Sequence, residues 1–212
     1  MPPRTTPTST SLPTGVAANT LYYVISAGYG ANAFQFSATR GGAAIKAAIE
    51  QLLGAGTVSP PYWRGDRYFL SRREPGQQFS VLYVVDPDGT ERTLIDPIAL
   101  DPEGLTTLDS WQPSKEGGRL AYQLSVGGNE ESLLYVMDVA TGTTIEGPID
   151  RCRYSPIAWL IGGFAFYYVR RIAPELLPES EQNFHRRVYL HIVGTPADDD
   201  ILVFGAGMTK IG

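Results

Sequence analysis

Few side chains in this chain could act as catalysts. A general base is most often histidine, and the 212 residues contain two, His185 and His191. If both lie near one extended strand, their separation of six residues spans about 20 Å, which is too far to act as a pair or to share a metal ion. His191 alternates with Tyr189 and Val193, which predicts a strand side chain whose hydrogen bonds are satisfied.

No residue in the chain has the surroundings expected of a catalytic nucleophile. The G-x-S-x-G turn of α/β-hydrolases does not occur, and SAGYG at residues 26–30 has similar residues in a different order, so a loop is expected there. Arg151 and Arg153 could lower the pKa of the single cysteine, Cys152. A buried structural thiol is favoured, because Cys is among the most buried residue types. We therefore expect no catalytic residue here.

The acidic and glycine-rich stretches predict turns and loops. DPDGTE at residues 86–91 resembles the start of a calcium loop, but Asp-Gly between apolar runs is the commonest hairpin signal. Asp198–Asp200 predicts a solvated loop, because three adjacent carboxylates repel unless a cation bridges them. Strands or polar loops follow the glycine pairs 117–118, 127–128 and 162–163, whereas a dinucleotide loop needs a helix. We expect no metal site and no cofactor.

Composition excludes several classes of partner. The net charge of −5 argues against nucleic acid and anionic membranes, which need clustered Lys and Arg. No stretch approaches the 18 apolar residues of a transmembrane helix, and the opening MPPRTTPTSTSLPTG lacks the apolar centre of a secretory signal. One cysteine fits a reducing compartment, so a cytoplasmic protein is expected.

The elements that would position any site begin after a poorly patterned start. Residues 1–40 predict a disordered or irregular tail, since they are rich in Pro, Ser, Thr, Ala and Gly. Residues 41–56 predict a short lead-in helix, whose apolar residues fall at i, i+4, i+7 and i+8: Ile45, Ile49, Leu52 and Leu53. From residue 57 to 212 the pattern is β throughout.

The β region repeats. Trp63, Trp111 and Trp159 are each 48 residues apart, and a glycine-containing turn and a strand-like run follow each one. A second run follows in each unit, anchored by tyrosines 52 and 54 residues apart: Tyr83, Tyr135 and Tyr189. A period of about 50 residues with several short strands per unit is typical of propeller blades. The alternative is a β-sandwich with chance spacing, but sandwiches have no constant long period. We predict a mainly β fold, a partial propeller of about three blades.

These repeats resemble a known family. The stretch WQPSKEGGRLAYQLSVGGNEESLLYVMDVATG at residues 111–142 is similar to the N-terminal propeller of the prolyl oligopeptidase family of serine peptidases. WRGDRYFLSRREPGQQFSVLYV, YSPIAWLIGGFAFYYVRR and VYLHIVGTPADDDILVF agree with it in the same order, from about residue 57 to about residue 209. The resemblance implies cleavage after proline in short peptides, with a seven-bladed propeller that caps the catalytic cavity and excludes folded proteins.

Two departures from the family qualify these expectations. Residues 1–40 contain nothing like the family's aromatic, acidic D-P-Y-R-W-L-E segment, as if they came from a wrong start or frame. The chain also stops at Gly212, before further blades and the hydrolase domain with its Ser-Asp-His triad. We expect a gating, substrate-access portion that is inactive alone and meets proline-containing peptides through the full enzyme. The alternatives are a non-catalytic module that stacks with a partner or itself, and a truncated product without an independent role.

Overall fold

The protein is seen here as a computed structural model that describes residues 23–30, 33–37, 49–52 and 54–207. The chain divides into two compact units, Met1–Ala55 and Gly56–Gly212. No helix within the described residues is both long and apolar enough to cross a membrane.

The first unit contains an antiparallel hairpin of β1 (Tyr23–Gly30) and β2 (Ala33–Ser37). Residues 26–30, where a loop was expected, lie in β1, which corrects that expectation; of the stretch 1–40 that was expected to be a disordered or irregular tail, the residues outside the two strands lie outside the described residues. The strands were hard to recognise because Ala, Gly and Ser carry little β propensity. Residues 49–52 and 54 are helical, and the rest of the helix expected within 41–56 lies outside the described residues.

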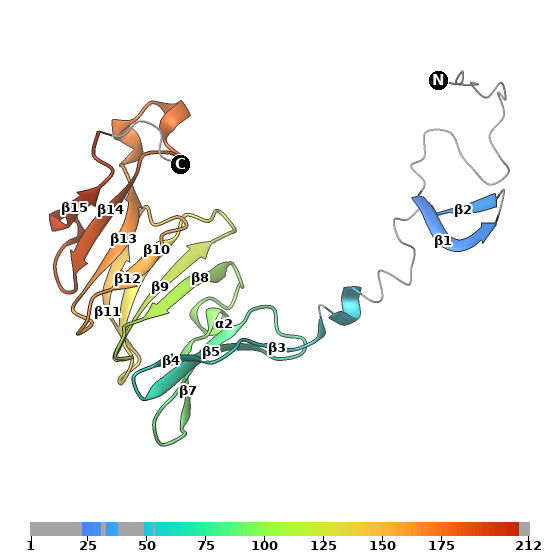
Figure 1. The fold of residues 1–212 in the computed structure, drawn as a ribbon, viewed down its shortest axis with the longest axis horizontal. Coiled ribbons are helices and arrows are strands. Elements are labelled where there is room, and N and C mark those ends of the chain that lie inside the picture. The colour runs from blue at the N-terminus through green and yellow to red at the C-terminus, as the bar shows by residue number, and fades with distance from the viewer. Residues whose placement is uncertain (1–22, 31–32, 38–48, 53, 208–212) are drawn as a thin grey trace. The chain divides into compact units, whose positions relative to one another are not determined.

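The second unit consists of three antiparallel sheets side by side (Figure 1). In the first sheet β3, β5, β6 and β7 lie in that order and β4 pairs with β5. Its strands are β3 (Thr57–Val58), β4 (Tyr62–Arg64), β5 (Arg67–Arg73), β6 (Val81–Val85) and β7 (Glu91–Ile95). The short helix α2 (Pro97–Leu100) follows, capped by Asp96, whose carboxylate accepts from the backbone N–H of Ile98 at 3.0 Å.

The second and third sheets are four-stranded meanders, in which each strand pairs with its neighbour in the chain. The second comprises β8 (Thr106–Pro113), β9 (Arg119–Val126), β10 (Leu133–Asp138) and β11 (Thr143–Ile149). The third comprises β12 (Ile157–Trp159), β13 (Ala165–Arg171), β14 (Arg186–Ile192) and β15 (Ile201–Phe204). This arrangement confirms the predicted partial propeller, and no sheet in the described part of the chain closes on itself.

The core lies between the sheets, because alternate side chains of each strand point toward the neighbouring sheet. One cluster joins the first and second sheets: Phe69, Leu82, Val84, Ile95, Leu120, Tyr122, Met137 and Val139. Another joins the second and third: Ala121, Leu134, Val136, Ile149, Cys152, Trp159, Phe166 and Tyr168. Full burial of one large apolar side chain stabilises the fold by about 1.5–3 kcal/mol, so these two layers hold the three sheets together.

The three tryptophans lie on corresponding strands of the three sheets; Trp63 and Trp159 occupy the equivalent cross-strand row, and Trp111 lies two residues further from the turn. Each lies on the strand that opens the tight hairpin at the turn end, where Trp63 pairs with Tyr68, Trp111 with Tyr122 and Trp159 with Phe166. Trp111 packs on the first interface and Trp159 is buried in the second, so both face the preceding sheet. Trp63 lies on the opposite face of its sheet from Phe69 and is 58% exposed.

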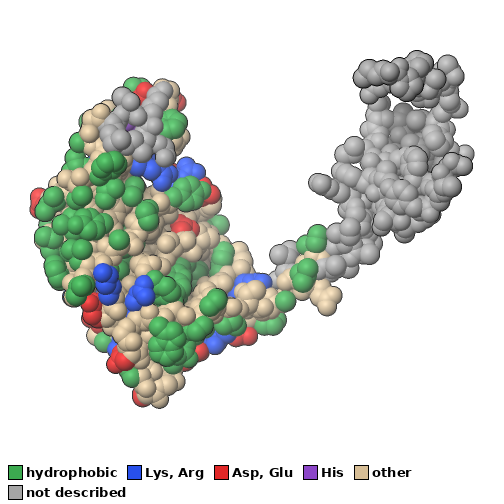
Figure 2. All heavy atoms as spheres, in the orientation of Figure 1, with side chains coloured by type: hydrophobic (Ala, Val, Ile, Leu, Met, Phe, Trp, Pro, Cys, Tyr) green, Lys and Arg blue, Asp and Glu red, His purple; other side chains and the backbone are tan. Residues whose placement is uncertain are grey.

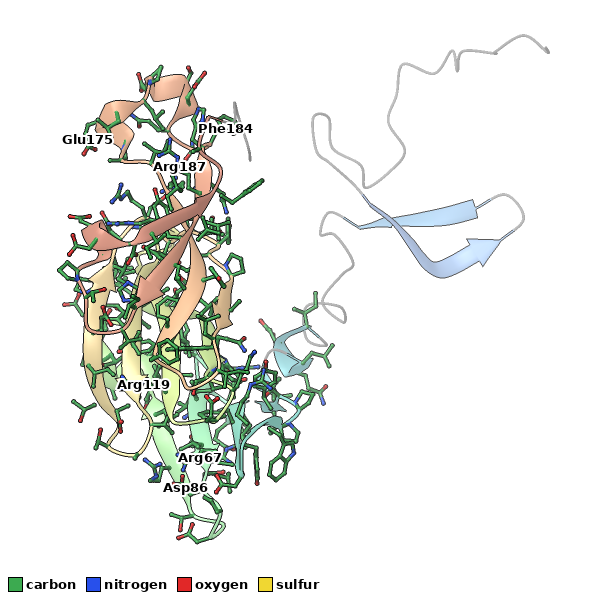
Figure 3. All side chains as sticks on the ribbon, turned by 60° about the vertical axis from the view of Figure 1, so that its left-hand side comes forward. Arg67, Asp86, Arg119, Glu175, Phe184 and Arg187 are labelled. Carbon is green, nitrogen blue, oxygen red and sulfur yellow. The ribbon has the colours of Figure 1, made fainter. Side chains whose placement is uncertain are left out.

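The sheets have two distinct ends. The turn end carries the tight connections β4–β5, β8–β9 and β12–β13, and the loop end carries the longer segments 127–132, 150–156 and 172–185. In Figure 3, Arg67, Asp86 and Arg119 lie toward the turn end, whereas Glu175 and Phe184 lie at the loop end. The turn end is tightly packed: a Cβ on Gly65 would lie 2.7 Å from the Glu116 carbonyl oxygen, and one on Gly117 would lie 2.7 Å from that of Arg64.

Candidate functional site

The first strands of the three hairpins come together along one edge of the sheets. Gln112 on β8 joins all three, because its Nε2 donates to the Tyr62 hydroxyl on β4 at 2.9 Å and its carbonyl oxygen accepts from Trp159 Nε1 on β12 at 2.8 Å. Of all strand pairs from different sheets, β8 and β12 make the most extensive contact. In a propeller the strands nearest the axis line the central channel. β4, β8 and β12 therefore form the channel side of these blades.

A hollow of about 470 Å³ opens beside β8 at the loop end. Its position follows from a β-bulge, because the pairing of β8 with β9 shifts between Leu108 and Ser110 and leaves Asp109 as the extra residue. A bulge turns a side chain out of its regular direction. The hollow is lined from the second and third sheets and their loops by Asp109, Ser110, Gln123, Glu130, Ser132, Tyr154, Ser155 and Pro156.

The Asp109 carboxylate is held by hydroxyl groups. Oδ1 accepts from the hydroxyls of Thr107 at 2.8 Å and Ser125 at 2.9 Å, and Oδ2 accepts from Ser132 at 2.6 Å. A carboxylate accepts hydrogen bonds through both oxygens, so three hydroxyl donors fix its orientation. The bulge thus places a negative charge beside the channel strand.

Two strained loop residues form the mouth of the hollow. Glu130 and Tyr154 have φ of 58° and 52°, in the left-handed region that non-glycine residues seldom adopt. The Tyr154 hydroxyl and Arg153 Nη2 both lie 2.5 Å from Glu130 Oε2. These hydrogen bonds hold the pKa of Glu130 below its usual value. Strain of this kind gathers at functional sites.

A second hollow of about 550 Å³ lies between the first and second sheets. It is lined by Ser71, Phe79, Ser80, Pro97, Thr107, Leu108, Asp109, Ser110 and Trp111. Asp109 and Ser110 line both hollows. The bulge of β8 therefore contributes to the lining of both hollows.

Both histidines are hydrogen-bonded to carboxylates away from this region. Both ring nitrogens of His191, which is fully buried, lie 2.7 Å from carboxylates, Nδ1 from Asp200 and Nε2 from Glu146. Burial lowers the pKa of the imidazole, but the bonds to Asp200 and Glu146 outweigh it and raise the pKa to about 9. His185 Nε2 lies 2.8 Å from Glu181. Neither described histidine bonds to a serine hydroxyl.

The His191 cluster confirms one prediction and corrects another. The imidazole is a satisfied strand side chain, as its alternation with Tyr189 predicted. The expectation of a solvated loop at Asp198–Asp200 holds for Asp198, whose side chain is 89% exposed, and is wrong for Asp200, whose side chain is 1% exposed. Asp200 also accepts from the Tyr168 hydroxyl at 2.6 Å. From the sequence, adjacent carboxylates were expected to need a cation that offsets their charge. For Asp200 that cation is the protonated imidazole of His191.

The remaining predicted positions are structural. Cys152 is buried, and desolvation raises the pKa of its thiol to about 12, so it is an inert core residue. Asp86 and Asp88 flank the β6–β7 turn, where Asp86 pairs with Arg92 at 2.6 Å and Asp88 accepts from the Thr90 backbone. The hairpin prediction for this stretch is confirmed. The sequence analysis did not single out Glu130, Tyr154 or Asp109, because their roles depend on a bulge and two irregular loops.

Stacked antiparallel sheets with β4, β8 and β12 along a common edge define a sector of a β-propeller. Residues 31–210 match the family described as prolyl oligopeptidase, N-terminal beta-propeller domain. This chain belongs to that family.

Two curated relatives are prolyl endopeptidases. The protein from Elizabethkingia meningoseptica is 30% identical over 149 residues, which is 70% of this chain and 21% of that protein. The one from Elizabethkingia miricola is 28% identical over 151 residues, 70% of this chain and 21% of its own length. This chain therefore spans about a fifth of the length of these relatives.

Solved structures show the same fold. One from a structural and mechanistic analysis of two prolyl endopeptidases has a TM-score of 0.69 at 25% identity and covers 75% of this chain and 24% of its own. Prolyl oligopeptidase B from Galerina marginata, bound to a 35mer hydrolysis and macrocyclization substrate, has a TM-score of 0.63 at 21% identity, covering 77% of this chain and 26% of its own.

Proposed function

We propose that this chain forms the gating portion of a prolyl oligopeptidase-like serine endopeptidase that cleaves short peptides after proline. Family membership over residues 31–210 is the observation that carries the proposal. In this role the three blades contribute wall and mouth to the cavity and restrict access, while the nucleophile, base and oxyanion hole are supplied outside these blades. The single buried cysteine fits action in the reducing cytoplasm.

The arrangement of the channel strands supports a role in access. Gln112 ties the three strands together through Tyr62 and Trp159, which makes the channel wall a connected surface. The two hollows open from that wall at the loop end. Among the described residues no histidine contacts a serine, so the chemistry of peptide cleavage is not assembled here.

A chimera tests the gating proposal. Residues 57–204 of this chain would replace the matching blades of the Elizabethkingia meningoseptica relative. We expect the folded chimera to hydrolyse a short chromogenic prolyl peptide and to spare a long, unstructured polypeptide that contains proline. A folded chimera that cleaves both at the same rate would show that these blades do not restrict access.

The isolated chain provides the complementary test. It should give no turnover of the same chromogenic peptide, because the groups that lower the barrier are missing. Turnover that a serine-directed inhibitor abolishes would contradict this expectation.

A non-catalytic interaction module is the second candidate, and the open face of the third sheet favours it. Tyr167, Ile192, Ile201 and Val203 on this sheet are 36%, 44%, 55% and 51% exposed. Figure 2 shows hydrophobic side chains gathered over the same region. Apolar sheet faces of this kind recruit a partner or a further copy.

A further inference from the structure

The outer strand of the third sheet differs from the outer strands of the other two sheets. β7, β11 and β15 each lie at the outer edge of their sheet, and each has a strand partner on one side only within the described residues (Figure 1). The other side of such a strand presents backbone N–H and C=O groups with which a further strand can pair. Proteins usually discourage this pairing with charged side chains or proline on the edge strand.

Two of the three outer strands carry such residues. β7 contains Glu91 and Arg92, and β11 contains Glu146 and Pro148, of which the proline has no N–H to donate. β15 reads Ile-Leu-Val-Phe and has neither a charge nor a proline. The register shifts where each outer strand meets its neighbour, so this irregularity does not distinguish β15 from the others. β15 is therefore the outer strand that is least protected against pairing.

The side chains of β15 are exposed on both faces of the sheet. Ile201, Leu202, Val203 and Phe204 are 55%, 38%, 51% and 56% exposed. Ile201 and Leu202 point to opposite faces, because consecutive residues of a strand alternate. A strand added at this edge would remove apolar surface from water on both faces at once.

Two rows of apolar side chains cross the third sheet and end at this edge, on the face turned away from the second sheet. The rows are Tyr167–Leu190–Ile201 and Val169–Val188–Phe204. If a second β15 pairs with the first in antiparallel direction, Ile201 of one copy can lie opposite Phe204 of the other. Each row then continues into the other row of the second copy, and apolar contact runs across both sheets.

The residues that flank β15 favour the antiparallel direction. Asp198 and Asp199 precede the strand and are exposed, whereas the uncharged residues 205–207 follow it. Antiparallel pairing sets the acidic end of each strand beside the uncharged end of the other. Parallel pairing in register would set the two acidic ends side by side, where like charges repel. An antiparallel pair of identical strands has a two-fold axis, and such an interface closes at two copies.

We propose that two copies of this chain pair through β15 about a two-fold axis, which joins their four-stranded third sheets into one antiparallel sheet. A second copy fits this edge because its own β15 supplies the matching apolar residues and places no acidic end against the first. The inference goes beyond the proposed function, since it does not depend on what the blades admit. Two strands of four residues make a small interface, so the dimer should be weak and form in the micromolar range.

Sedimentation of the full chain, with charge exchange at Val203, tests the proposal. Val203 lies beside the axis in this register and is 51% exposed, and thermal melts establish that its variants fold. Val203→Lys and Val203→Glu should each weaken the dimer at least about tenfold, because like charges meet across the axis and apolar contact is lost. An equal mixture of the two variants should restore the dimer, because opposite charges then meet.

Two control variants carry the same charge elsewhere. Ile145→Lys lies on the outer strand of the second sheet at a position that is 43% exposed. Ile192→Lys lies on the open face of the third sheet, on β14 instead of the edge strand, and is 44% exposed in the unmodified chain. Both should keep the dimer, the second whatever it does to the stacking of sheet faces.

Three results would overturn the proposal. The first is an unmodified chain that stays monomeric across the micromolar range, which would leave the edge to a strand of a different protein. The second is a dimer that survives in both Val203 variants and is lost in Ile192→Lys, which would place the contact on the open face. The third is a mixture of Val203→Lys and Val203→Glu that associates no better than either variant alone.

Discussion

His191 is the most constrained titratable residue described in this chain. It lies fully buried between Glu146 on β11 and Asp200 before β15, so it joins the second and third sheets. Glu146 Oε2 also accepts from the Gly194 backbone at 2.9 Å, and Asp200 accepts from the Tyr168 hydroxyl. A buried charge is tolerated only when it is paired and hydrogen-bonded, and this one is.

The pH dependence of stability tests the charge on His191. The folded-state pKa of about 9 lies above the ordinary value of 6.5, so the protonated ring stabilises the fold fully below about pH 6.5. This contribution is lost as the pH rises through about 9. Urea unfolding should show a loss on the order of 3 kcal/mol between these values, at 1.36 kcal/mol per pKa unit.

Two variants test whether this pH dependence of the free energy of unfolding comes from His191. His191→Gln should remove most of it, besides lowering stability at neutral pH, because two carboxylates lose their cation. His185→Gln, which alters a pair within the loop-end segment, should keep the slope of the unmodified chain. A flat profile for the unmodified chain between pH 6.5 and 9.5 would mean that His191 is neutral in the fold.

The elements are held in register by contacts that recur from one sheet to the next. At the turn end, the β4–β5 and β8–β9 turns approach through Gly65 and Gly117, and Glu116 Oε1 accepts from the Gly162 backbone of the next turn at 2.7 Å. Because a side chain has no room at these glycines, the turns set how closely the sheets stack.

Paired glycine substitutions separate crowding from backbone strain. Gly117 and Gly142 have φ of 74° and 69°, but a Cβ at Gly142 would meet nothing within 4 Å. Gly142→Ala should therefore cost only the left-handed backbone penalty, about 1–2 kcal/mol. Gly117→Ala should cost at least about 1 kcal/mol more, as is usual when extra atoms are forced into packed structure. Equal losses in urea unfolding would show that the two turns do not touch.

The matching tryptophans allow a second comparison of elements. Trp159→Ala should cost about 3–5 kcal/mol, because Trp159 is 4% exposed in the second core layer. Trp63→Ala should cost less than about 1 kcal/mol, since Trp63 has no neighbouring sheet on its face in the described structure. Denaturant unfolding of both variants measures the difference, and similar losses would show that Trp63 is covered in solution.

The same comparison shows what could be predicted from sequence. The spacing of Trp63, Trp111 and Trp159 indicated the repeated sheets, because a blade repeats its interface residues at a fixed period. The hollows beside β8 could not be predicted in this way. Glu130 and Tyr154 acquire their roles from left-handed loop conformations, and Asp109 acquires its role from a bulge. Asp200 was misjudged because its partners, His191 and Tyr168, lie on other strands, and only the pairing of the third sheet brings them to it.

The second unit as a whole presents two open sheet faces. On the third sheet, Tyr167, Leu190 and Ile201 form a cross-strand row opposite the face that packs on the second sheet. On the first sheet, Trp63 and Tyr68 lie on the face turned away from the second. Each internal interface packs the face of one sheet that looks toward the C-terminal sheet against the face of the next sheet that looks back. The open face of the third sheet is of the first kind and that of the first sheet is of the second kind, so the open faces of two copies could pack in the same way.

We expect the isolated chain to self-associate at micromolar concentration. Sedimentation at increasing protein concentration measures this, and the double variant Ile192→Asp with Ile201→Asp should shift the chain toward monomer because charge opposes burial of that face. Ile145→Asp, at an equally exposed position on β11, is the matched control and should not. A monomer that melts cooperatively would contradict the expectation.

The graded exposure of the tryptophans gives the chain an intrinsic optical signal. The indole of Trp63 is 58% exposed and that of Trp159 is 4% exposed, although they hold equivalent positions. The emission of the first should be red-shifted and readily quenched by iodide, and that of the second blue-shifted and protected. A further blade or a partner that covers the first sheet would bury Trp63 and give it an emission like that of Trp159. Fluorescence alone could therefore follow the completion of the ring.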